Sequence, residues 1–336
     1  MHTSGRTYFN TSIETMNKKI ITNSLLCLLA FSEVHAAKAV NQDITASPSS
    51  KQKGYNLNGL YGYQNFKFNS TSDSNFNRFS GHLNLYMLGS NNIRLREDLN
   101  AGLSIYQVDS QVNSSLLLNP NFPSETHQVV RNNSVYGRLL KTIKPYLLLD
   151  VVGGLGHNSL SYSTLIAKNT EYQQQGRARS NSDNWFGGVN GIYSHSFRDW
   201  KFLGSIGVLY SQVNQDSFNY VFIPNNSTTR VPFLRNKSSF ALENAELSYQ
   251  LKDWVQPFVN AGLIQVLQFE NNRSSISGEF LGALPEFNLD QNGYRAGGGL
   301  SFKYKQLTLR IEHQYSQRTD VYHSNLTMVS LNVNMA

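Results

Sequence analysis

The sequence predicts an all-β protein, a closed antiparallel transmembrane β-barrel of about twelve strands. Two observations carry this prediction. From Tyr55 to the carboxyl terminus, segments of roughly ten residues in which apolar and polar side chains alternate follow one another, as in barrels that cross a membrane. The joins between these segments are alternately short and long, as expected when turns lie on one side of a membrane and loops on the other.

The composition agrees with an apolar outer surface. Of 336 residues only 15% are charged, while 12% are aromatic. A membrane-spanning helix needs about 20 consecutive apolar residues, and no segment of this sequence has them. A closed barrel can still cross a membrane, because its backbone N–H and C=O groups pair between strands.

The amino-terminal residues have the layout of a secretory signal. A basic start at residues 16–19 precedes an apolar stretch at residues 20–31, and small residues at 34–36 follow, so we expect cleavage after Ala36. The only cysteine, Cys27, lies within the apolar stretch, and Leu26 before it argues against lipidation. We expect a mature chain without a thiol or a disulfide.

The chain therefore divides into three parts: an extension and cleaved signal at residues 1–36, a short periplasmic or luminal linker at 37–54, and the barrel at 55–336. The formal net charge is +7. In an exported protein this charge suits anionic lipid head groups, and we expect no nucleic-acid partner.

The first four predicted strands each show a period of two, which places alternate residues on one face. Leu57, Gly59, Tyr61 and Tyr63 share a face of the first, and Phe79, Leu83 and Leu85 a face of the second. Leu99, Ala101 and Leu103 mark the third, and Val135, Gly137 and Leu139 the fourth. These strands cover residues 55–68, 78–88, 95–108 and 134–140.

The remaining strands follow the same rule with two irregularities. The fifth is apolar on both faces from Tyr146 to Val152 apart from Asp150, and the eighth carries Glu243 on its apolar face. The others alternate regularly. The eight predicted strands are residues 145–162, 185–197, 201–213, 240–251, 255–269, 294–304, 307–315 and 326–335.

The joins give the topology. Short turns are predicted at residues 89–92, 142–144, 198–200, 252–253 and 305–306. Long polar loops are predicted at residues 69–77, 109–133, 163–184, 214–239, 270–293 and 316–325. Short turns face the periplasm in such barrels and long loops face outward, so both ends of the barrel should lie in the periplasm.

Facing can be assigned on the last strands, where charged residues occupy one face. Tyr294, Ala296, Gly298, Leu300 and Phe302 should meet lipid, which turns the alternate residues into the lumen. The candidate site is a lumen charge network of Arg295, Lys303, Arg310 and Glu312. A structural network is the plainer interpretation, and a selectivity role in a pore is the alternative.

Several other residues carry weaker signals. Aromatic residues near the strand ends, such as Trp185 and Tyr249, are typical of interface girdles. Arg230, Arg235 and Lys237 fall in the longest predicted loop region. They suit either a solvated loop or contact with lipopolysaccharide phosphates.

Four glycine-containing stretches carry a resemblance to a known family. They are GVLYSQVNQDSF at residues 207–218, NGYRAGGGLS at 292–301, GLSIY at 102–106 and GGLGH at 153–157. With them the chain resembles the β-domain of autotransporters from about residue 55 onward. The resemblance implies a twelve-stranded outer-membrane barrel, a linker helix in its lumen and an amino-terminal passenger. This sequence has no passenger-like segment before the barrel.

Enzymatic chemistry is not expected. On a strand His313 and Ser316 point to opposite faces, as do His323 and Ser324, whereas a catalytic pair needs hydrogen-bond contact. No nucleophile elbow, zinc-protease motif, phosphate loop or metal-ligand spacing is present in the sequence. We expect no catalytic residue, no metal and no cofactor.

The sequence thus predicts an integral outer-membrane barrel protein with surface-exposed loops and no cargo domain of its own. A small diffusion channel is the alternative. The expected partners are outer-membrane lipid and lipopolysaccharide, the barrel assembly machinery and an unknown surface ligand. The protein is expected to be a monomer.

Overall fold

The computed structural model describes residues 55–335, except 73–74, 118–122, 167, 172, 224–225, 272–291 and 320–321. Within them every named element is a β-strand. The strands are β1 (Tyr55–Ser72), β2 (Asn75–Arg96), β3 (Leu99–Leu117), β4 (Pro123–Lys144), β5 (Leu147–Ile166), β6 (Gln174–Phe197), β7 (Trp200–Gln215), β8 (Phe218–Ile223), β9 (Ser227–Val231), β10 (Leu234–Tyr249), β11 (Val255–Asn271), β12 (Gly293–Tyr304), β13 (Leu307–Arg318) and β14 (Tyr322–Met335).

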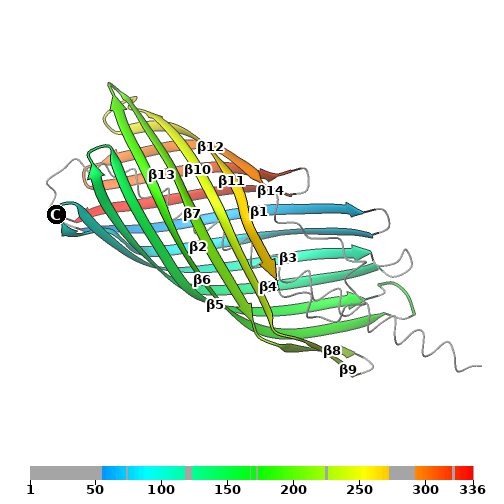
Figure 1. Cartoon of the computed structure of the whole chain (residues 1–336). Coiled ribbons are helices and arrows are strands. Elements are labelled where there is room, and N and C mark those ends of the chain that lie inside the picture. Colours follow the sequence, from blue (N-terminus) through cyan, green and yellow to red (C-terminus); the bar gives the residue numbers. More distant parts are fainter. Residues whose placement is uncertain are drawn as a thin grey trace, which may run out of the picture.

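Twelve of these strands form a closed ring (Figure 1). Each strand from β1 to β7 pairs antiparallel with the next, β7 pairs with β10, and the series continues from β10 to β14. The ring closes where β1 pairs with β14, from Tyr55 opposite Met335 to Phe68 opposite Tyr322. Strands β8 and β9 stand outside the ring as a hairpin beside the outer end of β6. The predicted closed barrel of twelve antiparallel strands is confirmed.

The predicted turns near residues 198–200, 252–253 and 305–306 are confirmed, and the other two need correction. Residues 142–144 are the end of β4, the turn is at residues 145–146, and β5 begins at Leu147 rather than at residue 145. Residues 89–92 are not a turn but part of β2, which continues to Arg96, so β3 begins at Leu99 rather than at residue 95. Register shifts between Ser90 and Ile93, and between Arg94 and Arg96, let the pairing with β3 continue through this stretch. The turn itself is at residues 97–98.

The predicted long loops are wrong in extent, because the strands continue through most of them. The region 109–133 is largely the ends of β3 and β4, and 163–184 is largely the ends of β5 and β6. The region 214–239 contains β8, β9 and the start of β10. Polar residues there indicated loops, but the alternate residues are apolar and buried, so the period of two persists with the polar face outward. Residues 272–291 of the predicted loop 270–293 lie outside the described part.

The outer face of the ring carries an apolar band. Leu155, Ile206 and Val259 are 60–70% exposed on it. Trp200 packs on Tyr249 with ring centroids 4.8 Å apart, and Trp254 on Phe302 at 6.3 Å, beside the short turns. Aromatic pairs at the edges of an apolar band are the girdles of a membrane barrel. No helix in the described part of the chain is long and apolar enough to span a membrane.

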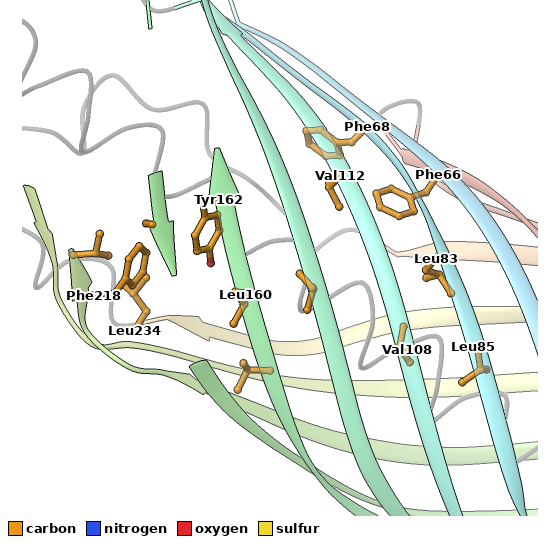
Figure 2. Close-up of a cluster of buried hydrophobic side chains, with 14 of the residues drawn as sticks. Phe66, Phe68, Leu83, Leu85, Val108, Val112, Leu160, Tyr162, Phe218 and Leu234 are labelled. Atoms are coloured by element: carbon orange, nitrogen blue, oxygen red, sulfur yellow. The ribbon is translucent and has the colours of Figure 1, made fainter. Parts of the chain in front are cut away.

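Toward the loop end of the barrel the polarity of the wall is reversed. On this part of β1 to β5 the inner face is apolar and buried, with Phe66, Leu83, Val112 and Leu160 among its members. The outer face of the same stretch is polar. Figure 2 shows these side chains on neighbouring strands, with Phe218 facing Tyr162. The two rings stack with centroids 5.4 Å apart, so the β8–β9 hairpin joins the apolar lining.

Candidate functional site in the barrel lumen

A buried charge cluster lies on the inner face of β10 to β13. We define it as Glu246, Arg295, Arg310 and Glu312. Arg310 is held by two carboxylates: its Nη2 lies 2.7 Å from Glu246 Oε2 and 3.1 Å from Glu312 Oε2, and its Nη1 donates to Glu246 Oε1 at 3.1 Å. The three side chains are 6–13% exposed. A two-point guanidinium–carboxylate contact of this kind is both strong and directional.

Glycine makes this contact possible, since Arg310 and Glu246 lie on strands separated by β11 and β12. Gly299 of β12 is opposite Glu312 of β13 and Phe258 of β11. The guanidinium of Arg310 lies over the Phe258 ring, 3.5 Å from its centroid, in a cation–π contact. A Cβ at Gly299 would lie 2.7 Å from Phe258 Cζ and would collide with the Ile311 carbonyl oxygen. The absence of a side chain at Gly299 therefore leaves room for the Arg310 side chain to reach Glu246.

Arg295 is buried in the same cluster and donates to Asn244 Oδ1. Asn260 Nδ2 donates to Glu312 Oε1 at 2.8 Å and so ties β11 to β13. Lys303, the fourth residue of the predicted network, is exposed near the end of β12. The structure thus brings Arg295, Arg310 and Glu312 together, without Lys303.

Glu246 is a member of the cluster that the sequence does not predict. The alternation of its strand places it on the polar face, but nothing in the sequence shows that β10 is near β13. The contact crosses two strands and depends on how the inner side chains pack. The available signal was an inward acidic residue with a basic residue, Lys201, on the neighbouring strand β7, two residues from its direct partner Leu203.

A second charge pair lies on β4 and β5. Arg138 Nε donates to Asp150 Oδ1 at 2.8 Å, and both side chains are fully buried. Asp150 is the polar exception noted in an otherwise apolar stretch of β5. The structure explains it, because an inward carboxylate there meets the guanidinium of the neighbouring strand.

An asparagine layer follows on the same strands, farther toward the loops. Asn132 Nδ2 donates to Asn158 Oδ1 at 2.7 Å and to Asn184 Oδ1 at 3.0 Å. Asn158 Nδ2 donates to Ser182 Oγ at 2.9 Å, and Ser134 Oγ to Asn132 Oδ1 at 2.6 Å. The layer links β4, β5 and β6. Beyond it begins the apolar lining.

The lumen thus changes in character along its length, from charge pairs through amides to apolar side chains. Charges that are paired and dry hold strands in place but offer no free group for chemistry. Among the described residues no group of three or more His, Cys, Asp or Glu is placed to hold a metal ion. His313 faces outward and lies 2.9 Å from Thr327 Oγ1, while Ser316 is on the inner face, opposite Arg295.

Comparison with known proteins gives a consistent result. The family model "Autotransporter beta-domain" matches residues 56–314. The translocator domain of the autotransporter NalP from Neisseria meningitidis is similar, with a TM-score of 0.61, 12% identity, and 90% of this chain and 98% of that chain covered. The transport unit of AIDA-I from Escherichia coli gives a TM-score of 0.54, 11% identity, and coverages of 90% and 98%.

The CymD monoaromatic hydrocarbon channel is also similar, with a TM-score of 0.50, 11% identity, and 88% of this chain and 92% of that chain covered. At such identities these likenesses concern the fold. The chain matches no protein among the curated sequences.

Proposed function

The chain belongs to the autotransporter β-domain family, and from this membership we propose how its outer-membrane barrel works. It is an integral outer-membrane protein of the autotransporter type. We propose that its bore is closed at the level of the charge cluster and that its surface-exposed wall and loops carry its function. The observation that supports this is the burial of the Arg310 and Arg138 ion pairs inside the lumen. An open bore would hydrate them.

Planar-bilayer recording tests this proposal. The purified barrel, shown to be folded by heat-modifiable migration on a gel, is added to a bilayer and its conductance is recorded. We expect no steady conductance from the wild type. A stable conductance whose ion selectivity changes in Arg310→Gln would overturn the closed bore, because the cluster would then line a water-filled path.

A small diffusion channel is the second candidate. The apolar lining of the outer part of the lumen favours it, because such a surface would suit an apolar solute. The fold is shared with a protein described as a monoaromatic hydrocarbon channel, which also supports a diffusion channel. Liposome uptake of a small aromatic hydrocarbon distinguishes the candidates: uptake that is lost in Val112→Asp supports the channel, and no uptake supports the closed bore.

The proposal includes export by a cleaved signal. The layout of residues 16–36 supports cleavage after Ala36. Amino-terminal sequencing of the membrane-inserted protein tests the cleavage site, since the mature chain should begin at Ala37.

The proposal also includes assembly and partners. The seam between β1 and β14 is the kind of contact that the barrel assembly machinery would close. The barrel acts as a monomer without cofactor or catalytic step, in contact with outer-membrane lipid, lipopolysaccharide and a surface ligand.

A further inference from the structure

Three arginines gather on the outer face of the wall where the β8–β9 hairpin joins β6. Arg177 and Arg179 are two residues apart on β6 and so share a face, and Arg177 is opposite Val221 of β8. Arg230 of β9 is opposite Asn219 of β8, which lies on the same face as Val221. All three are exposed. Two strand spacings separate β6 from β9, about 10 Å. We call these residues the arginine patch.

In the part of the chain that the structure describes, no carboxylate is paired with the patch. Three acidic residues of this outer face pair with other cations: Asp109 lies 2.9 Å from Arg131, Asp183 lies 2.8 Å from His157, and Glu125 lies 2.8 Å from Lys168. Among the described residues no ion pair and no side-chain hydrogen bond includes a member of the patch. Its positive charge is therefore available to an external anion.

The position of the patch indicates which anion it meets. Trp185 is exposed on the same face of β6 and lies beside Tyr210, with ring centroids 4.9 Å apart, as at a girdle. Arg179 is six residues farther toward the loops, about 20 Å along the strand and roughly 15 Å above the girdle once strand tilt is included. Anionic groups at this height would stand above the apolar outer band of the barrel, so a ligand whose phosphate groups lie above its acyl chains fits this surface.

We infer that the arginine patch binds phosphate groups of lipopolysaccharide. The inference rests on the proposed function, because the outer-membrane orientation places β8 and β9 on the cell surface. A guanidinium binds phosphate oxygens through two parallel hydrogen bonds, and three of them within about 10 Å can engage more than one phosphate. Arg230 had been predicted within a loop, together with Arg235 and Lys237. All three are strand residues.

Arg235 and Lys237 are less available than the patch. Arg235 lies over the Phe233 ring at 5.6 Å, and Lys237 lies 3.6 Å from Glu270. The patch therefore differs from the three cations of the predicted loop, and Arg230 is common to both sets.

Binding of purified lipopolysaccharide to the full chain, refolded in lipopolysaccharide-free detergent, tests the inference. The patch variant is Arg177→Gln/Arg179→Gln/Arg230→Gln. A control of equal charge, Arg131→Gln/Lys168→Gln/Lys237→Gln, removes cations that already have acidic partners. We expect the patch variant to bind at least about tenfold more weakly than the wild type, with a much smaller loss for the control.

Chemically dephosphorylated lipopolysaccharide is the second probe. It should bind the wild type about as weakly as the patch variant binds the intact molecule, and high salt should weaken only the phosphate-dependent binding. Equal affinities of wild type and patch variant, or of intact and dephosphorylated lipopolysaccharide, would overturn the inference. Heat-modifiable migration of every variant reports separately on the barrel, so failure of the membrane assignment cannot be mistaken for failure of the patch.

Discussion

Arg310 contacts a carboxylate two strands beyond its neighbour because the residue in between, Gly299, has no side chain. The guanidinium uses the space to lie on Phe258 and to bind Glu246 and Glu312 together. A single glycine of β12 thus permits contacts that join β13 to β11 and β10. The glycine run at residues 297–299, which contributed to the family resemblance, has a structural role here.

Replacing Gly299 by Ala tests this account. The new Cβ would press on the Ile311 carbonyl oxygen and on Phe258, so we expect a loss of about 1–3 kcal/mol in stability from overpacking. Gly59→Ala is the control, because nothing lies within 4 Å of the corresponding Cβ. The measurement is the temperature at which the heat-modifiable band converts to the unfolded form. Equal conversion temperatures for the two variants would show that a side chain at Gly299 does not disturb the packing around Arg310.

The buried pair of Arg138 and Asp150 gives a second residue-level prediction. Arg138→Leu leaves a buried carboxylate without its partner and should cost about 3–5 kcal/mol. The double variant Arg138→Leu/Asp150→Leu should recover most of that loss. Arg131→Leu, which breaks an exposed pair, should cost under about 1 kcal/mol. Denaturant unfolding in detergent micelles measures all three, and a double variant as unstable as the single one would contradict the account.

At the scale of residues, the sequence predicts which side chains lie on the inner face of the barrel, but not which of them are in contact. The period of two correctly placed Arg295, Arg310 and Glu312 on the inner face, since parity is a local property of a strand. The contact between Arg310 and Glu246 could not be predicted, because it depends on side-chain packing across strands that are not neighbours. Lys303 has the right parity but lies too near the end of its strand to be buried.

At the scale of elements, the wall continues well beyond the apolar outer band. β4 and β6 are 22 and 24 residues long, whereas about 9–11 residues suffice to cross a bilayer. In their outer parts the apolar face is turned inward and the polar face outward, as in a water-soluble barrel. The sequence pattern contains this reversal, but the polar residues of the outer face lead to a prediction of loops there. Strand centres were therefore predicted well and strand ends poorly.

The β8–β9 hairpin is an addition to the ring rather than part of it. Gln215 at the end of β7 is paired with Leu234 at the start of β10, so the wall is continuous without the residues between them. We expect that replacing residues 216–233 by a short turn leaves heat-modifiable migration intact. Removal of β7 (Trp200–Gln215) is the control and should abolish it, since β6 and β10 would both lose a neighbour. Loss of the folded band in the hairpin deletion would mean that β8 and β9 are needed to form the wall.

At the scale of the whole molecule, the central claim is that twelve strands close into one ring within a single chain. The number of strands and their antiparallel order were predictable, because turns and alternation are local features. The register of the seam was not, because β1 and β14 are distant in sequence. Its closure gives β1 and β14 a hydrogen-bonded neighbour on both sides, so that their backbone groups are paired where the apolar outer band lies in the membrane.

Cross-linking across the seam tests this claim most directly. With Cys27 replaced by Ser, Leu57→Cys and Val333→Cys lie directly opposite each other on β1 and β14. Directly opposite residues in antiparallel strands are about 4.5–5.5 Å apart, within the range of a disulfide. The pair Leu57→Cys and Val329→Cys shares the same face but is four residues out of register, about 13 Å away. The account predicts an intramolecular disulfide in the outer membrane for the first pair and none for the second. Disulfides only between chains, or equally in both pairs, would contradict a closed barrel with this register.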